Sequence, residues 1–174
     1  MPAHQRLQLF CSRCNERRVD FPMVVVTCFI ARGEKLLWMR RGLEPKAGCW
    51  AIPGGFLEND ETLAEGAARE LREETGIELP ASALELYMVG SITFINQVYV
   101  AFRASVDSDF VAPGNEALEC RFFSLQDCPW DEVAYPEVND VIEQAYRDLA
   151  TGEFRVWHSQ MTAKGYQRWA VAPE

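Results

Sequence analysis

The most restrictive feature of the sequence is an acidic helix whose two ends are both specified by local signals. Thr62 and Glu65 have the spacing of a capping box, and good helix formers fill the positions that follow. Gly76 stands where a left-handed C-terminal cap belongs. We therefore expect a helix over residues 62–75, entered from a turn at Gly54-Gly55.

The carboxylates of this helix are placed to act together. Residues three and four positions apart share a helix face, so Glu70, Glu73 and Glu74 should project to one side. Arg69 lies four positions from both Glu65 and Glu73 and is expected to bridge them. The helix therefore presents three like charges on one face, with one arginine to orient them.

Two interpretations of the acidic face differ in what balances its charge. A solvated surface helix usually intersperses Lys at i+4, yet the chain has no Lys between Lys46 and Lys164. Three carboxylates and a carbonyl from the Gly-Gly turn are instead hard oxygen ligands, which suit Mg²⁺ or Mn²⁺. A divalent ion would relieve the repulsion. The missing Lys favours the metal site over the surface helix.

The segments around the helix indicate an α/β or α+β chain with a mixed β-sheet. Apolar and β-branched runs bounded by turns are typical of strands, and an apolar stripe of helical period marks a second helix. Strands are expected over 23–31, 35–41, 50–53, 84–92, 96–105 and 120–124, and the second helix over 138–151. Strands before, between and after two helices favour a layered sandwich.

The spacing of the acidic stretch resembles the Nudix box. Gly55 is followed by five residues and Glu61, then by seven residues and the run RELREETGI, which starts at Arg69. Every fixed position of that signature is present. The resemblance implies a Nudix α/β/α sandwich and metal-dependent hydrolysis of a nucleoside diphosphate linked to a further group.

The resemblance also implies roles for individual residues. It implies that two or three divalent ions bind the carboxylates of Glu70, Glu73 and Glu74 and the carbonyl of Gly55. Arg69 and Glu61 become supports that orient the carboxylates. The general base is implied to be Glu73 or a carboxylate outside the box.

The outside carboxylate has two candidates in the run APGNEALEC. Glu119 comes directly before an expected strand and is the preferred metal-binding and catalytic residue. Glu116, three positions earlier, is its competitor. The alternative for both is an ordinary surface glutamate.

The runs GCWAIPGGFLE and APGNEALECRFFSLQDCPWDEVAYP, with the early F-C-x-x-C, resemble a branch of FAD and ADP-ribose pyrophosphatases. That resemblance implies ADP-ribose or FAD as substrate, with AMP and a phosphorylated product. The branch begins with a zinc ribbon of two CxxC pairs. Only Cys11 and Cys14 are present here, and a closed zinc site needs four ligands, so Zn²⁺ is not expected. The Pro-rich motif that follows the box in the NADH pyrophosphatases is absent, which argues against NADH as the preferred substrate.

Two other functions remain open at this stage. One is a hydrolase that removes unwanted nucleoside triphosphates, and the other is a non-catalytic module that senses a nucleotide. The intact box carboxylates argue against the second.

Substrate contacts are expected from arginines that end a strand and from nearby aromatic rings. Arginine suits phosphate oxygens and an aromatic ring can stack on a base, although aromatic residues in strands belong more often to the core. The candidates are Arg40, Arg41, Trp50, Phe56, Phe94 and Tyr99.

The overall composition limits the partners. A net charge of −9 and a pI near 4.8 argue against a nucleic-acid binder with a broad basic surface. The chain has neither a run of about 20 apolar residues nor a secretory signal at its start, so we expect a cytoplasmic protein without membrane contact. A nucleotide is the expected small-molecule partner, and a homodimer is implied by resemblance only.

Three segments are expected along the chain. Residues 1–22 form an N-terminal arm, 23–152 the Nudix domain and 153–174 a C-terminal tail. The tail either docks on a neighbouring subunit or packs on its own domain.

Overall fold

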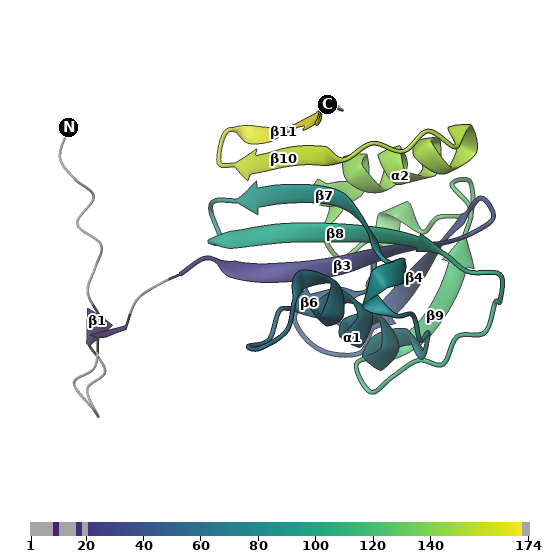
Figure 1. Cartoon of the computed structure of the whole chain (residues 1–174), viewed down its shortest axis with the longest axis horizontal. Helices are drawn as coiled ribbons and strands as arrows, with labels where there is room; N and C mark the ends of the chain where they lie inside the picture. Colours follow the sequence, from purple (N-terminus) through teal and green to yellow (C-terminus); the bar gives the residue numbers. More distant parts are fainter. Residues whose placement is uncertain (1–8, 11–16, 19–20, 172–174) are drawn as a thin grey trace.

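The computed structural model describes residues 9–10, 17–18 and 21–171, so Cys11 and Cys14 lie outside the described residues. The described chain is built around a mixed nine-stranded sheet (Figure 1). Its strands and α-helices are, in chain order, β1 (Leu9–Phe10), β2 (Arg17–Arg18), β3 (Met23–Arg32), β4 (Lys35–Arg41), β5 (Trp50–Ala51), β6 (Gly54–Phe56), α1 (Leu63–Thr75), β7 (Glu85–Ile92), β8 (Gln97–Ser105), β9 (Ala117–Phe123), α2 (Asn139–Thr151), β10 (Trp157–Thr162) and β11 (Gly165–Ala170).

The sheet is mixed, as expected. Its strand order is β11-β10-β7-β8-β3-β4-β5, with β6 beside β3 and β9 beside β4. β3 is parallel to β8 and β7 is parallel to β10, while the other described pairs are antiparallel. β1 and β2 pair only with each other.

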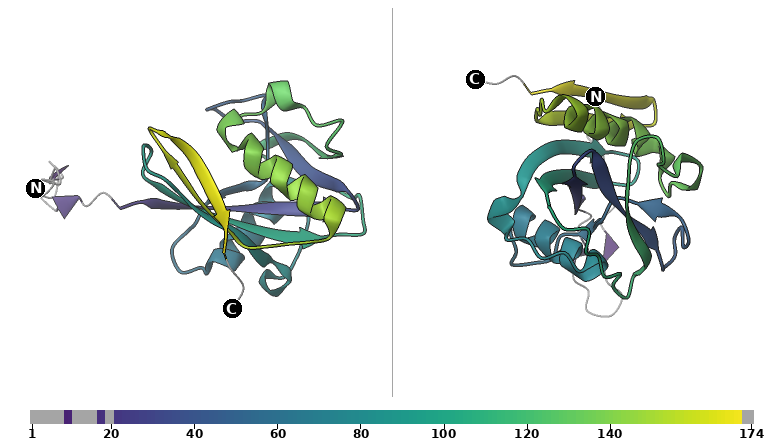
Figure 2. Two further views of the ribbon diagram at one scale, coloured as in Figure 1. Left: turned by 90° about the horizontal axis from the view of Figure 1, so that it is seen from above. Right: turned by 90° about the vertical axis from the view of Figure 1, so that its right-hand side faces the viewer.

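The two helices cover opposite faces of the sheet, which gives the expected α/β sandwich (Figure 2). Side chains of β3 alternate between the two faces. Val26 and Cys28 pack with Leu71 of α1, while Phe29 packs with Ile142 of α2. β3 is apolar on both sides because it lies between two cores.

The acidic helix has the predicted ends. The Thr62 hydroxyl accepts a hydrogen bond from the Glu65 N–H at 3.3 Å, and the Glu65 carboxylate accepts one from the Thr62 N–H at 2.8 Å. Gly76 is left-handed, with φ of 71°, and its N–H donates to the Arg72 carbonyl. The predicted capping box and C-cap are both confirmed.

The expected strand over residues 50–53 is only β5 at Trp50–Ala51, and a second strand, β6, begins at the Gly-Gly turn that follows. β5 pairs with β4, whereas β6 pairs with β3. Between them the Pro53 carbonyl accepts a hydrogen bond from the Thr27 hydroxyl at 2.6 Å. The chain thus crosses from one strand to another within a few residues, and this crossing carries the Gly-Gly turn to the start of the acidic helix.

The C-terminal residues complete the sheet. β10 and β11 form a hairpin, and β10 pairs with β7. The tail therefore packs on its own domain, one of the two arrangements that the sequence left open.

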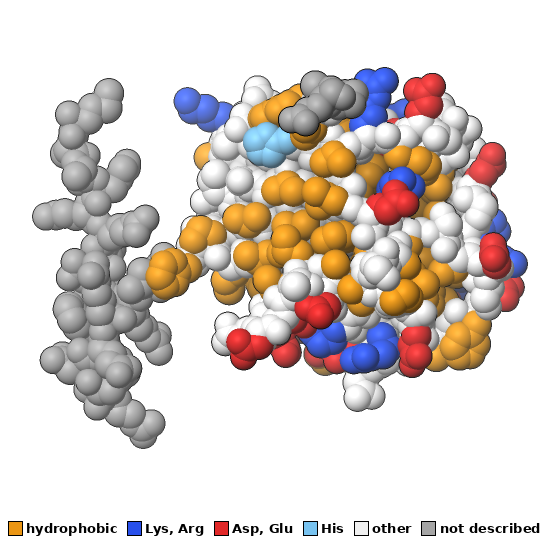
Figure 3. All heavy atoms as spheres, in the orientation of Figure 1, with side chains coloured by type: hydrophobic (Ala, Val, Ile, Leu, Met, Phe, Trp, Pro, Cys, Tyr) orange, Lys and Arg blue, Asp and Glu red, His pale blue; other side chains and the backbone are white. Residues whose placement is uncertain are grey.

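One face of the sheet carries exposed apolar side chains. Figure 3 shows them gathered over β7, β8 and β3. Leu86 and Trp169 are 42% and 43% exposed.

Both α-helices of the described chain are short. Each has 13 residues, and neither has the length and hydropathy of a membrane span.

Candidate active site

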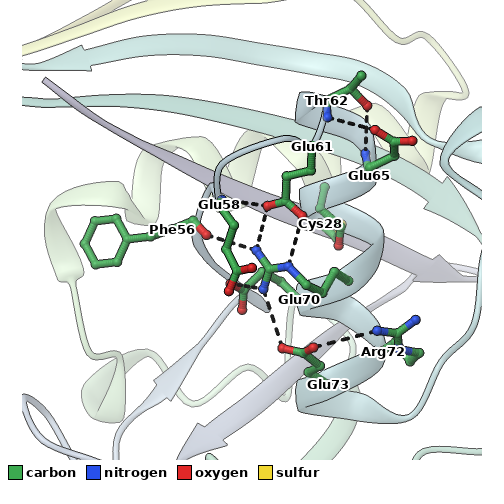
Figure 4. A network of polar contacts seen from close by, with 11 residues as sticks. Cys28, Phe56, Glu58, Glu61, Thr62, Glu65, Glu70, Arg72 and Glu73 are labelled. Carbon is green, nitrogen blue, oxygen red and sulfur yellow. Dashed lines mark hydrogen bonds and ion pairs between the residues drawn. The ribbon is translucent and has the colours of Figure 1, made fainter.

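Arg69 is the centre of the polar network on α1, and Figure 4 shows its partners Phe56, Glu61, Glu70 and Glu73. Its guanidinium donates two hydrogen bonds to the Glu61 carboxylate, at 2.8 and 3.0 Å, and one to Glu70 at 2.8 Å. A further N–H reaches the Phe56 carbonyl at 3.0 Å. These bonds hold the pKa of Glu61 below its ordinary value. One arginine therefore joins the loop before α1 to the carboxylates on it.

The expected partner Glu65 is not part of this network. Its carboxylate is used by the capping box with Thr62. Arg69 does reach Glu73, at 3.5 Å. The expectation that Arg69 bridges Glu65 was wrong. The Glu65 carboxylate is bound in the capping box, and the Arg69 guanidinium is bound by Glu61.

Glu74 is the buried carboxylate of the site. Its side chain is turned into the protein, where the Gly54 N–H donates to it at 2.7 Å. Burial raises the pKa of Glu74 to about 8, the Gly54 hydrogen bond opposes that rise, and the charges of Glu70 and Glu116 add to it. Without a cation, this carboxyl is largely protonated near neutral pH.

Glu70 lies against the Gly-Gly turn. Burial raises the pKa of its carboxyl, with the Arg69 hydrogen bond opposing. A Cβ atom at position 55 would lie 2.5 Å from a Glu70 oxygen, so a larger residue there would displace the Glu70 carboxylate. Glu73 is the outermost of the three, with 54% of its side chain exposed beside Arg72.

These groups fit a hard divalent cation by their chemistry. Among residues 9–10, 17–18 and 21–171, no three acidic, His or Cys side chains are already gathered in a metal-holding arrangement, because Glu70 faces Arg69 and Glu74 faces Gly54. Crowded carboxylates with raised pKa values are nevertheless what a cation would stabilise in the ionised form. Binding would require them to exchange protein donors for the ion.

Glu116 is the outside carboxylate that lies near the box. Its charge raises the pKa of both Glu70 and Glu74. Its loop is fastened to the end of α1, where the Gly114 N–H donates to the Glu74 carbonyl at 3.0 Å. A Cβ at position 114 would overlap the Glu73 carbonyl oxygen, so the glycine permits this contact.

Glu119, the preferred candidate from the sequence, is placed elsewhere. Its register partner is Arg40, and it forms an ion pair with Arg121 at 2.6 Å. Arg40 lies over the Trp50 ring, in the core on the α2 side of the sheet. The structure therefore brings Glu116 to the box carboxylates and leaves Glu119 on the opposite face.

An apolar cavity of about 110 Å³ lies mostly on the α2 side of the sheet and reaches the acidic cluster only at Gly54, whose N–H donates to Glu74. Its walls include Tyr99, Tyr135 and Ile142, and Gly54 and Arg41 belong to it as well. The Arg41 guanidinium lies 5.9 Å from the Tyr135 ring centre, and its charge lowers the pKa of Glu74. Arg41 thus stands between an apolar pocket and the carboxylates.

The other expected substrate contacts are distributed unevenly. Trp50 borders the cavity but is 5% exposed and packs edge-to-face on Phe123 at 4.9 Å, as a core residue does. Arg40 is held by the Gly48 carbonyl at 2.8 Å and by Glu132. Phe56 and Phe94 are 50% and 57% exposed, and Figure 4 shows the Phe56 ring turned away from the carboxylates.

Tyr135 is a cavity residue that the sequence analysis missed. It lies in the loop before α2, at the end of the run that resembles the FAD and ADP-ribose pyrophosphatases, but that resemblance assigned it no role. Loop aromatics carry no periodic signal, so nothing in the sequence distinguished it from a surface tyrosine.

The raised pKa of Glu74 leads to a prediction for the metal-free protein. Between the ordinary value of 4.5 and about 8, the folded chain holds a proton that the unfolded chain releases. The folded state therefore loses stability as pH rises from 4.5 to about 8, and the loss is complete above that value. In EDTA, the Tm should fall by about 3 °C or more between pH 6 and pH 9. Mg²⁺ should raise the Tm more at pH 9 than at pH 6.

The matched control is Glu74→Gln, which keeps the shape and removes the titration. It should flatten the part of the profile that depends on this group. If the Tm in EDTA changes equally between pH 6 and pH 9 in the wild type and in Glu74→Gln, Glu74 is not the group with the raised pKa.

The fold and the site together define a class. An α/β sandwich in which a Gly-Gly turn and a capped acidic helix surround one arginine is the architecture of a Nudix hydrolase. The NUDIX domain family model matches residues 21–145, and the chain belongs to that family.

Relatives agree with this assignment. A crystal structure of a NUDIX hydrolase from Nitrosomonas europaea is 35% identical, with a TM-score of 0.75, over 88% of this chain and 87% of that one. The ADP-ribose pyrophosphatase of Methanocaldococcus jannaschii is 36% identical over 111 residues, which are 62% of this chain and 65% of the relative.

A second kind of curated relative is longer. The NAD-capped RNA hydrolase NudC of Salmonella heidelberg is 29% identical over 130 residues, 74% of this chain and 49% of that protein. The chain therefore spans about two thirds of the first curated relative and about half of the second.

Proposed function

We propose that this Nudix hydrolase is a divalent-metal-dependent diphosphatase acting on ADP-ribose, FAD or a similar nucleoside diphosphate joined to a second group. The products are AMP and a phosphorylated remainder. The observation that carries the proposal is the apolar cavity that meets the acidic cluster at Gly54 and Arg41. A base fits the cavity, an arginine suits the diphosphate, and the carboxylates suit the cations.

The proposed cation site consists of Glu70, Glu73, Glu74 and the Gly55 carbonyl, with Mg²⁺ or Mn²⁺ as the ion. When bound, such ions offset the charge of the diphosphate and activate a water molecule. Arg69 keeps Glu70 and Glu73 oriented from one side and Glu61 braces Arg69 from the other.

The reaction is a displacement at phosphorus. A carboxylate of the chain takes a proton from water, the water oxygen bonds to one phosphorus, and the bond from that phosphorus to the bridging oxygen breaks. The bridging oxygen leaves with the other phosphate group. Glu73 and an outside carboxylate remain the candidates for the base, and Glu116 is better placed than Glu119 because its charge already acts on Glu70 and Glu74.

Two independent observations support a small nucleoside diphosphate, and not capped RNA, as the substrate. The named ADP-ribose pyrophosphatase relative shares more of its length with this chain than the NAD-capped RNA hydrolase does. The net charge of −9 also disfavours a long polyanion such as RNA. A homodimer in the cytoplasm stays a prediction.

A substrate panel with Mg²⁺ and Mn²⁺ tests the proposal. ADP-ribose, FAD, NADH, coenzyme A and nucleoside triphosphates are incubated with the protein, and the products are separated by chromatography. We expect AMP from ADP-ribose or FAD. Pyrophosphate from triphosphates alone would replace the substrate proposal with the sanitising function, and tight nucleotide binding without turnover would indicate a sensing module.

A further inference from the structure

The β10–β11 hairpin lies outside the segment that the family model matches, which ends at residue 145. Figure 2 shows the hairpin next to α2. Polar contacts join the hairpin to α2 at both ends of the helix, and the first turn of α2 forms a wall of the apolar cavity.

The contact at the start of α2 is an ion pair. Arg168 of β11 donates from Nε to the Asp140 carboxylate at 2.6 Å. Only 16% of the Arg168 side chain is exposed, and its guanidinium lies 4.7 Å from the Trp157 ring centre. Stacking on the ring and burial limit the motion of the Arg168 guanidinium, so less side-chain entropy is lost when it pairs with Asp140.

The contact at the end of α2 uses a buried carboxylate. Asp148 is 5% exposed and accepts hydrogen bonds from the Tyr87 hydroxyl at 2.8 Å and from the Trp157 indole N–H at 3.3 Å. Trp157 therefore takes part in both contacts, with its ring under Arg168 and its N–H on Asp148. The helix is held at two points by one hairpin.

The first turn of α2, which the Arg168–Asp140 pair holds, is also the turn that faces the cavity. Val138, Val141 and Ile142 line it. Asp140 lies between the first two of these in sequence and points instead to Arg168. A shift of this turn would change the cavity, whereas the acidic cluster on the α1 side would stay in place.

We propose that the C-terminal hairpin is a positioning element for the substrate cavity and that Arg168 is the positioning residue, acting through Asp140 on the first turn of α2. This inference rests on the proposed function, in which the cavity receives the nucleoside. Loss of the ion pair weakens substrate binding and leaves the chemical step nearly intact, because Arg168 is remote from the carboxylates.

Steady-state kinetics of Arg168→Gln and Asp140→Asn test the inference, with whichever diphosphate the wild type hydrolyses. We expect KM to rise about three- to tenfold and kcat to stay within about twofold. Arg168→Lys, which keeps the charge and loses the fork, should lie between wild type and Arg168→Gln. The matched control is Arg147→Gln, whose exposed partner Glu143 is on the same helix at 3.4 Å. It should leave both constants unchanged.

Hydrogen exchange provides a measurement that needs no turnover. The amides of residues 139–142 should exchange faster in Arg168→Gln than in wild type, and Arg147→Gln should match wild type. Unchanged exchange, or a fall in kcat at constant KM, overturns the inference. Absence of hydrolysis on the whole panel overturns the proposed function instead, and the exchange experiment then still decides whether Arg168 holds the helix.

Discussion

Glu73→Gln is expected to lower kcat by on the order of 100-fold or more while the Tm stays within about 2 °C of wild type. Glu73 is the most exposed of the three box carboxylates, with 54% of its side chain in solvent. Its only described partners are Arg69 at 3.5 Å and Arg72 at 3.7 Å. The core does not depend on it, so its loss should affect the cations and the base and leave the fold unchanged.

The control is Glu78→Gln, an exposed glutamate just beyond the same helix. It removes the same charge from the same region and should retain wild-type kcat. A second measurement separates the two roles proposed for Glu73. If Glu73 binds the cation, the Mg²⁺ concentration for half-maximal activity should rise, whereas a pure base would leave that concentration unchanged. Full activity of Glu73→Gln would show that the cations bind elsewhere.

The parts of the structure that the sequence predicted best are those encoded within a few residues. Thr62, Glu65 and Gly76 define both ends of α1 because each makes its bond within one helical turn. The continuous run of apolar and β-branched residues in β3 similarly indicated a buried strand. Such signals need no knowledge of the rest of the chain.

Contacts between distant segments were less accessible. The i,i+4 rule suggested Glu65 as a partner for Arg69, but the main partner is Glu61, eight positions away on the preceding loop. Only the resemblance to the Nudix box pointed to Glu61. The parallel pairing of β10 with β7 was likewise beyond local inference, because the register between distant strands depends on the assembled sheet.

The choice between Glu116 and Glu119 shows the same limit at a single site. The register of β4 and β9 shifts between Arg40 and Arg41, so that Arg40 pairs with Glu119 and Arg41 with Ala117. A shift of one residue sends a side chain to the other face of a sheet. Nothing local in ALEC marks that irregularity, and only the assembled strands show which glutamate reaches the α1 side.

This difference in placement leads to the sharpest test of the site. Glu116→Gln should lower kcat by about 100-fold, the contribution typical of a general base or a close carboxylate partner, whereas Glu119→Gln should lower it by less than about threefold. The two glutamates are three positions apart and the substitutions are identical. Any general effect of removing a negative charge from this part of the chain is therefore matched between them.

The pH profile adds a readout that loss of folding would not produce. If Glu116 accepts the proton, its loss should remove the acidic limb of kcat against pH, because that limb reports the base in the enzyme–substrate complex. The opposite ranking, with Glu119→Gln inactive and Glu116→Gln active, would mean that β9 changes register when substrate and cations bind. Equal and small effects would leave Glu73 as the base, since no other candidate then accounts for proton removal.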